Sequence, residues 1–394
     1  MNKEFFSDLL VIAFTFVLVG TRLVAINPIM MNLSIAIMGL LCYLFFLLTS
    51  KRNDIKVKSY IYGFFLSVCM MLSIAYNGNA NITNVLWIWA YMGVGLLLYE
   101  YGVKKLSGFI IFYTVNLYFI SLALKGQIMI DEILETGSAN NLSVISLFTM
   151  ILFYLSRRES LTNLIVFIPV YIVMFVSLWT GSRAGLLSAV VFYVLVIIIE
   201  FLATKKQRWK LYIVISLSII LIGVFVIQWY EMFSVVLEGK LERSGMESSR
   251  TLIWNDYFKG LTDNVGNFIF GVPGLDPQYQ HLKEYSGNTH NIFLMLHSKY
   301  GLIGFVGVFF FILKAVRKLF HNKQWILLCL LMVIIIRGMF DWVAFPGSMD
   351  VLLWYFIFYA SLSIPPVYVK NQQFRTYNIV VRQRQKRNDY NKNL

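Results

Sequence analysis

Long apolar stretches recur from one end of the chain to the other, and short polar segments separate them. Each stretch holds about 17 to 24 residues with few charges, close to the roughly 20 residues with which a helix crosses the hydrocarbon layer of a membrane. Because lipid offers no partners to backbone N–H and C=O groups, each stretch predicts an α-helix. We expect twelve membrane spans, at 8–26, 29–49, 59–76, 84–101, 106–124, 139–155, 162–180, 184–203, 211–229, 291–313, 325–345 and 349–366.

The composition agrees with this pattern and excludes a soluble protein. Apolar residues make up 58% of the chain and charged residues only 14%, which is typical of a multispanning membrane protein. The pattern therefore predicts an all-α fold with one membrane domain over residues 1–369. A long outward loop, residues 230–290, interrupts this domain between the ninth and tenth spans, and a polar tail, residues 370–394, follows it.

Basic residues cluster on alternate connections, which indicates the orientation of the chain. Lys and Arg accumulate on cytoplasmic loops, and with both termini inside, most of the 34 basic residues fall in cytoplasmic segments. The net charge of +14 thus reflects membrane topology, and it predicts no nucleic-acid partner. The tail, with RQRQKR at 382–387, either stays solvated and maintains this orientation or lies against anionic membrane lipids.

The outward loop is the only long internal segment that is not strongly hydrophobic, and we place the function there. Ser248 and Ser249 precede RTLIWNDYFKGL, whose apolar residues recur at helical spacing. This part predicts a capped helix that lies along the membrane face or over the mouth of the bundle. Arg250 falls in its first turn, where the helix dipole does not favour a cation. Arg250 is therefore either a solvated side chain or a residue that holds an anion.

His290 and Asn291 end the outward loop in the sequence NTHN, at the outer boundary of the tenth span. Imidazole exchanges a proton near neutral pH, so a histidine here is able to accept the proton of a sugar hydroxyl. The alternative is a structural histidine that makes hydrogen bonds at the membrane boundary. His281 and His297 are weaker candidates than His290 for a chemical role.

Two more arginines lie on the outer side of the membrane. In the TGSRAG motif between the seventh and eighth spans, Gly181 and Gly185 allow a tight turn. Arg183 in this turn is either a substrate ligand or a snorkelling side chain. Arg337 lies inside the eleventh span, and Asp341 follows four residues later on the same helix face. An arginine within a span costs roughly 2.5–3.5 kcal/mol on insertion scales, so we expect a polar cavity or a structural ion pair.

Together these residues favour a ligand that carries both phosphate and sugar. A guanidinium group binds phosphate through two parallel hydrogen bonds, and a lipid-linked pyrophosphate sits at this depth of the membrane. Carboxylate, imidazole, indole and amide groups suit sugar hydroxyls. The substrate contacts that we expect, besides those of the catalytic residues, are Arg337, Asp341, Asn291 and Trp254.

Three segments resemble a known family: TGSRAG before a span, SSRTLIW in the outward loop, and THNIFLMLHSKYGLIGF at the loop exit. They look like those of the O-antigen ligase and Wzy-type polysaccharide polymerase superfamily, which the twelve-span plan also resembles. The resemblance implies a GT-C-like glycosyltransferase at the outer face of the bacterial plasma membrane. Its donor would be an oligosaccharide on undecaprenyl pyrophosphate, and it would use no metal, cofactor or nucleotide sugar.

The resemblance also implies roles for the candidate residues. Arg183 and Arg250 would hold the pyrophosphate, whose negative charge grows as the glycosidic bond breaks. His290 would orient or deprotonate the acceptor hydroxyl. Arg337 and Asp341 would complete the polar cavity as a second phosphate contact or as support. A chain-length regulator is a further partner that the resemblance leaves open.

Three functions fit this plan, and we favour the first. A polymerase joins lipid-linked repeat units of O-antigen, capsule or exopolysaccharide, and an outward loop of only about 60 residues favours it. An O-antigen ligase transfers the glycan to another acceptor, such as a lipid A core. A flippase or transporter of the same lipid would need charged or broken helices through the midplane, whereas the polar residues here gather at the outer end.

Overall fold

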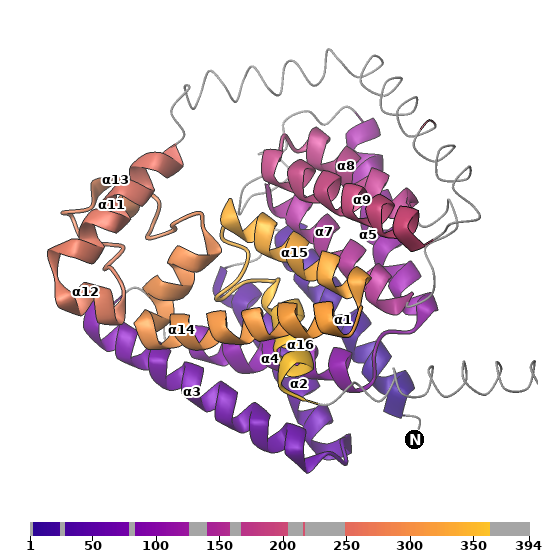
Figure 1. The fold of residues 1–394 in the computed structure, drawn as a ribbon, viewed down its shortest axis with the longest axis horizontal. Helices are drawn as coiled ribbons and strands as arrows, with labels where there is room; N and C mark the ends of the chain where they lie inside the picture. The colour runs from indigo at the N-terminus through magenta and orange to yellow at the C-terminus, as the bar shows by residue number, and fades with distance from the viewer. Residues whose placement is uncertain are drawn as a thin grey trace, which may run out of the picture.

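The computed structural model describes residues 3–23, 28–78, 83–125, 140–157, 167–203, 216 and 249–362. In this part of the chain the regular structure is entirely helical (Figure 1). The helices are α1 (Lys3–Leu23), α2 (Pro28–Thr49), α3 (Asn53–Asn77), α4 (Thr83–Glu100), α5 (Lys105–Leu124), α7 (Asn140–Ser156), α8 (Ile168–Trp179), α9 (Arg183–Ala203), α11 (Ser249–Asp263), α12 (Val265–Phe270), α13 (Gln280–Glu284), α14 (Ile292–His321), α15 (Trp325–Met339) and α16 (Asp350–Ser361).

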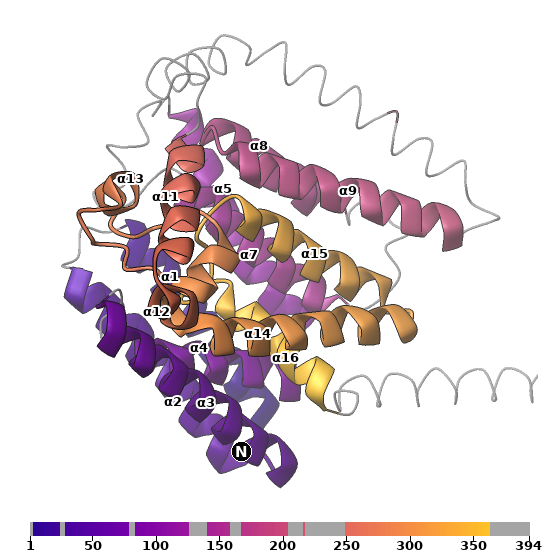
Figure 2. The same cartoon turned by 60° about the vertical axis from the view of Figure 1, so that its left-hand side comes forward.

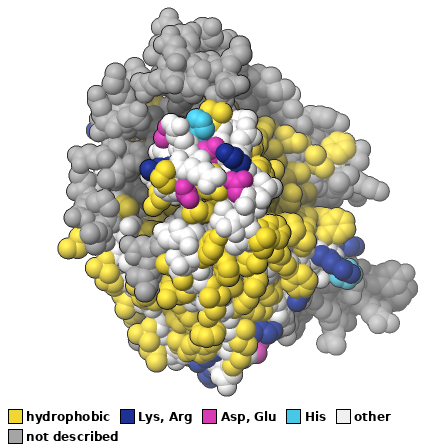
Figure 3. Space-filling view, turned by 90° about the vertical axis from the view of Figure 1, so that its left-hand side faces the viewer, with side chains coloured by type: hydrophobic (Ala, Val, Ile, Leu, Met, Phe, Trp, Pro, Cys, Tyr) yellow, Lys and Arg dark blue, Asp and Glu magenta, His cyan; other side chains and the backbone are white. Residues whose placement is uncertain are grey.

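Helices lie at every predicted span except 211–229, which falls outside the described residues. Within the described residues, α1, α2, α3 and α5 are long and apolar enough to cross a membrane, and shorter apolar helices accompany them. Large apolar side chains also cover the surface: Leu48, Phe64 and Leu106 are 76%, 67% and 68% exposed. Figure 3 shows these apolar side chains as a broad surface beside a polar, charged cap. The chain is thus a multi-pass membrane protein.

The helices α4, α7 and α16 form the centre of the bundle, because nearly all residues of α7 and α16 are buried, as is the second half of α4 from Tyr91 to Tyr99. Close approach between these helices needs small residues, as is usual in membranes. A Cβ atom added at Gly95 of α4 would lie 2.7 Å from the backbone oxygen of Val351 in α16. The helices around this centre expose large apolar side chains, which are suited to face lipid.

Connections that the sequence predicts to be cytoplasmic meet at one end of the bundle. Lys3 Nζ donates to the Thr49 carbonyl at 2.6 Å, which brings the start of α1 to the end of α2. Lys58 Nζ likewise reaches the carbonyl of Ser361 at the end of α16, at 2.8 Å. The alternation of basic and neutral connections therefore corresponds to the two ends of the folded bundle.

Several predicted boundaries are wrong, and two of them lie in the second half of the chain near the outward loop. The eleventh span was expected to reach residue 345, but α15 ends at Met339 and an irregular segment, residues 340–349, follows. Pro346 disfavours a helical conformation in the residue before it, and the Asp350 carboxylate accepts the backbone N–H groups of Phe345 and Gly347. These contacts hold the segment in a turn that faces the outer end of the bundle.

The tenth span is also longer than expected, because α14 continues to His321 and not only to residue 313. It contains a break at Gly301, whose φ of +66° favours glycine. A Cβ atom there would lie 2.5 Å from the Ile269 carbonyl oxygen. Glycine thus permits the segment before α14 to pack tightly on this helix.

The helices α11, α12 and α13 form a compact unit at the end of the bundle that is predicted to face outward, here called the outer end. We call this unit the outer-loop module (residues 249–291; Figures 1 and 2). Its small core contains Ile253 and Tyr257 of α11, together with Val272, Tyr279 and Leu282. The predicted helix of this loop is confirmed, because α11 contains RTLIWNDYFKGL. Because Ser248 is not described, its predicted capping role stays a prediction.

Hydrogen bonds fasten this module to the membrane helices. Ser73 Oγ at the outer end of α3 donates to the Phe270 carbonyl at 2.7 Å, and Asn77 Nδ2 donates to the Phe270 and Gly271 carbonyls. On α14, His297 lies between the Tyr257 hydroxyl at 2.7 Å and the Phe268 carbonyl at 2.8 Å. Burial holds the pKa of Tyr257 well above its usual value, so the phenol remains a hydrogen-bond donor. These contacts give His297 a structural role, in agreement with its weaker candidacy for a chemical role.

Candidate functional site

Arg337 and Asp341 form an ion pair at the outer end of α15. Arg337 Nη2 donates to Asp341 Oδ2 at 2.9 Å, and the Arg337 side chain is fully buried. The pairing was expected, but its predicted basis was wrong, because Asp341 lies beyond the end of the helix and not on one of its faces. The other carboxylate oxygen of Asp341, Oδ1, is therefore able to contact a second residue.

The residue that Asp341 Oδ1 contacts is His290. The imidazole Nδ1 lies 3.4 Å from Asp341 Oδ1, and the ring packs edge-on against Tyr285 at 5.5 Å between centroids. His290 has a φ of +48°, uncommon for a residue with a side chain, and its backbone N–H donates to Asn288 Oδ1 at 2.9 Å. This turn presents the imidazole to the carboxylate. His290 Nε2 makes no hydrogen bond within the described residues.

The carboxylate of Asp341 sits between a cation and an imidazole, which stabilises its charge. Burial alone would raise its pKa, but the hydrogen bond and charge of His290 and the guanidinium of Arg337 outweigh burial. The pKa of Asp341 is therefore well below the usual value near 3.9. A permanently ionised carboxylate is suited to orient an imidazole and to stabilise its protonated form.

Arg337 has hydrogen-bonding capacity to spare. Within the described residues, its buried Nε and Nη1 atoms find no acceptor. Buried donors without partners are costly, and a negatively charged ligand would satisfy them. Arg250 of the outer-loop module is close enough for the two like charges to interact. Two neighbouring guanidinium groups of this kind are able to bind an anion.

Arg250 lies in the first turn of α11, as expected, and Arg183 is the first residue of α9. Figures 1 and 2 place the turn between α8 and α9, the start of α11 and the end of α15 at the same end of the molecule. Arg183 is exposed there. The structure thus gathers the predicted arginines on one side, with Arg337 as the buried member.

In the TGSRAG motif, the structure confirms the predicted role of one glycine and corrects that of the other. Gly181 has a φ of +59° and makes the expected tight turn. Gly185, however, lies inside α9, where an added Cβ atom would be 1.8 Å from Ser143 Oγ and 2.8 Å from Ser177 Oγ. The small size of Gly185 therefore permits α9 to pack closely on α7 and α8. Ser143 of α7 and Ser177 of α8 form a hydrogen bond with each other at 3.0 Å beside it. The glycine positions Arg183 through helix packing and not through the turn.

Asn291 and Trp254 hold the turn around His290 in place. Asn291 Oδ1 accepts the Phe293 and Leu294 N–H groups at the start of α14, and its Nδ2 donates to the Met339 carbonyl at 3.1 Å. Trp254 Nε1 donates to the Thr289 carbonyl at 2.8 Å. These contacts fix the residues on both sides of His290. Contact of either side chain with substrate stays a prediction.

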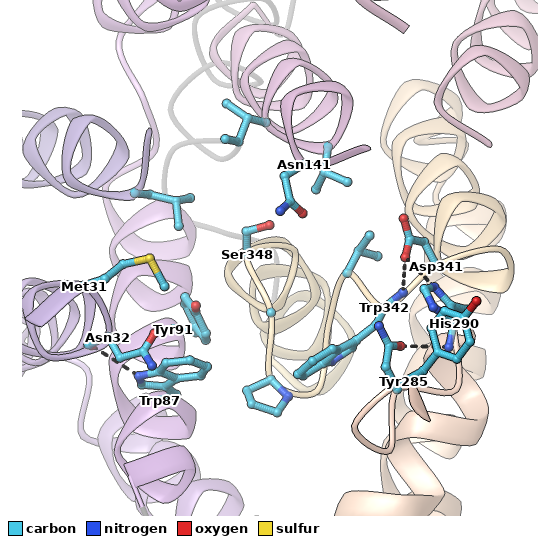
Figure 4. A pocket seen from close by; sticks show the side chains of 17 residues that line it. Met31, Asn32, Trp87, Tyr91, Asn141, Tyr285, His290, Asp341, Trp342 and Ser348 are labelled. Atoms are coloured by element: carbon cyan, nitrogen blue, oxygen red, sulfur yellow. Dashed lines mark hydrogen bonds and ion pairs between the residues drawn. The ribbon is translucent and has the colours of Figure 1, made fainter. Parts of the chain in front are cut away.

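A cavity of about 530 Å³ opens beside His290 and Asp341 (Figure 4). Its near wall also includes Tyr285 and Asn288. The remaining walls come from membrane helices and the turn before α16; the polar and aromatic side chains that line them are Asn32, Trp87, Tyr91, Asn141, Trp342 and Ser348. The cavity thus joins the outer-loop module to the first half of the chain.

Sequence reasoning missed this far wall. Asn32 lies near the start of α2 and Asn141 near the start of α7, so each is an amide at the outer end of an apolar span. That position was a weak signal, since asparagine is also common at helix ends. Only the packing of α2, α4 and α7 around the turn before α16 shows that these side chains share a cavity.

Comparison with known proteins finds one similar family. The family model described as O-antigen ligase matches residues 168–309, and no curated protein matches the chain. The matched region runs from α8 into α14 and contains Arg183, Arg250 and His290, whereas Arg337 and Asp341 lie beyond it. Over residues 168–309, the chain is thus similar to the O-antigen ligase family of the Wzy superfamily.

Proposed function

We propose that this protein is a membrane glycosyltransferase that polymerises oligosaccharide repeat units carried on undecaprenyl pyrophosphate. The observation that carries the proposal is the buried Arg337, two of whose donor atoms have no acceptor in the part of the chain that the structure describes. Arg250 and the His290–Asp341 pair are its neighbours. Pyrophosphate supplies the acceptors that these donors lack, and a sugar hydroxyl suits the imidazole. The family match supports transfer of a lipid-linked glycan.

The proposed reaction is a displacement at the anomeric carbon of the donor sugar. An acceptor hydroxyl forms the new C–O bond while the bond to pyrophosphate breaks and its electrons leave with the phosphate. The hydroxyl proton moves to His290 Nε2, and Asp341 stabilises the resulting imidazolium. The guanidinium groups of Arg250 and Arg337 neutralise the charge that develops on the leaving group, with Arg183 as a third contact.

Ligase activity is the second candidate, because the matched family model is described as O-antigen ligase. We favour polymerisation because the outward loop is short, about 60 residues. In both reactions the same residues would activate the donor. The acceptor alone separates them, since a polymerase uses a second lipid-linked repeat unit and a ligase uses a different carrier.

The test is reconstitution of the purified protein in nanodiscs with lipid-linked repeat units isolated from a strain that lacks this protein. A ladder that grows by whole repeat units, and that disappears with Arg250→Ala, is the expected result. Transfer that occurs only after a lipid A core acceptor is added would make the protein a ligase. Movement of the lipid across the membrane of vesicles without a new glycosidic bond would make it a transporter and overturn the proposal.

A further inference from the structure

The cavity beside His290 has two walls of different chemistry. The near wall carries the His290–Asp341 pair, whereas Asn32 and Trp87 stand at the far side and Asn141 and Ser348 lie between the two (Figure 4). No lysine or arginine lines the cavity within the described residues. A pyrophosphate would find no cation there, so the cavity suits a ligand that is recognised through hydroxyl groups and apolar ring faces.

The far wall offers a fixed aromatic surface. Trp87 Nε1 donates to the Asn32 carbonyl at 3.4 Å, and the indole packs against Tyr91 at 6.2 Å between ring centroids. Tyr91 is itself buried against Phe14 of α1. These contacts hold the indole still, and the C–H face of a sugar ring packs well on such a surface because both are apolar.

Three polar side chains in the cavity have unused hydrogen-bonding groups. Within the described residues, Asn32, Asn141 and Ser348 make no side-chain hydrogen bonds, although each is half-buried. In Figure 4 the Asn141 amide and the Ser348 hydroxyl both project into the middle of the cavity. Amides and hydroxyls both donate and accept, so this group is able to pair with several sugar hydroxyls.

We infer that this cavity is the acceptor subsite, and that Trp87 and Asn141 determine which sugar it takes. The inference rests on the proposed function. The acceptor repeat unit is attached to lipid through its reducing end, so the sugar in the cavity is the one at its free, non-reducing end. One hydroxyl of this sugar meets His290 Nε2, and the donor pyrophosphate stays outside with Arg250 and Arg337.

The volume is consistent with this assignment. A cavity of about 530 Å³ falls within the roughly 300–1,000 Å³ that is usual for small-molecule sites. Donor and acceptor then approach His290 from opposite sides: the acceptor from the neutral cavity and the donor from the arginines. Loss of a cavity side chain should therefore weaken acceptor binding without weakening pyrophosphate binding.

The experiment measures two affinities separately on the full-length protein in nanodiscs. One probe is the free repeat-unit oligosaccharide, released by mild acid from the isolated lipid, and the other is inorganic pyrophosphate. Asn141→Ala and Trp87→Phe should each weaken oligosaccharide binding about tenfold and leave pyrophosphate binding within about twofold. Arg250→Ala should show the opposite pattern.

Matched controls come from the same helices. Asn140→Ala changes the residue next to Asn141, and Trp89→Phe changes an indole that donates to Ser67 on α3 and does not line the cavity. Both should bind the oligosaccharide as the wild type does. Equal losses in the controls would show a general effect of the substitutions on folding and would count against the subsite.

The inference and the proposed function fail in different ways. If the wild type builds polymer but does not bind the free oligosaccharide, or if Asn141→Ala and Trp87→Phe retain full oligosaccharide affinity, the cavity is not the acceptor subsite. The same holds if these variants lose pyrophosphate affinity instead. If the wild type transfers no glycan to any acceptor, the proposed function itself is wrong.

Discussion

At the scale of single residues, the geometry of Arg337 matters more than its charge. Lysine would keep the ion pair with Asp341 but would lose the planar fork that fits a phosphate. We therefore expect Arg337→Lys to lower the rate of repeat-unit transfer by about 10²- to 10³-fold, the usual effect of losing one charge-stabilising donor. The rate of ladder formation in nanodiscs measures this effect.

The matched control for this substitution is Arg317→Lys, at an exposed position of α14. It should leave both the rate and the melting temperature unchanged. Full activity in Arg337→Lys would contradict a bidentate phosphate contact. A melting temperature that falls in Arg337→Lys alone would instead assign Arg337 a purely structural role.

The low pKa of Asp341 makes a prediction about acid stability. A carboxylate whose pKa is lower in the folded than in the unfolded state contributes stability fully above its unfolded pKa, near 3.9, and loses it below. The stability difference between wild type and Asp341→Asn should therefore not shrink between pH 7 and pH 5. Melting temperatures over this pH range provide the measurement, and a difference that falls within it would show that Asp341 takes up a proton there.

At the scale of elements, activity depends on how tightly the outer-loop module packs on α14. Gly301→Ala would place a Cβ atom 2.5 Å from the Ile269 carbonyl, at a φ that favours glycine. Strain and overpacking of this kind cost about 1–3 kcal/mol. We expect a lower melting temperature and a loss of transfer, because α11 with Arg250 must shift away from His290.

Gly20→Ala is the control for this substitution, because no described residue lies within 4 Å of a Cβ atom added at Gly20, near the end of α1. It should retain wild-type stability and transfer. If Gly301→Ala also retained both, the module would be able to move without consequence. The rigid connection between α11 and α14 would then be irrelevant to catalysis.

At the scale of the whole molecule, the orientation in the membrane decides which face does chemistry. Lys283 in the outer-loop module and Lys323 between α14 and α15 are both exposed and lie in connections predicted to be on opposite sides. In intact cells, a membrane-impermeant maleimide should label Lys283→Cys, whereas Lys323→Cys should react only after the membrane is opened. The wild type provides the background, since Cys42, Cys69 and Cys329 are buried.

The reverse labelling pattern would place the arginines in the cytoplasm and exclude a lipid-linked donor on the outer face. Labelling of both variants in intact cells would instead indicate leaky cells. The same pair of positions also tests the twelve-span plan, which puts nine spans between the N-terminus and Lys283, because an even number of spans there would place Lys283 inside.

Sequence reasoning located most helices, because a stretch that is long and apolar enough to cross a membrane has no other stable conformation. It also singled out Arg337, since a charge inside an apolar span is costly wherever the helix packs. It misjudged the end of α15, where Pro346 and the Asp350 carboxylate redirect the chain. The role of Gly185 depended on Ser143 in another helix, and no local pattern reports such a contact.

The sequence by itself determined the helices, the side on which their connections gather, and the arginines and histidine that stand out against an apolar background. These properties depend on the local exchange of water for lipid, which each segment undergoes separately. The tertiary structure alone decided that Asp341 meets His290 across 51 residues and that Asn32, Trp87 and Asn141 share one cavity with them. Such contacts arise from the packing of helices far apart in the chain, and periodicity within one helix carries no information about its neighbours.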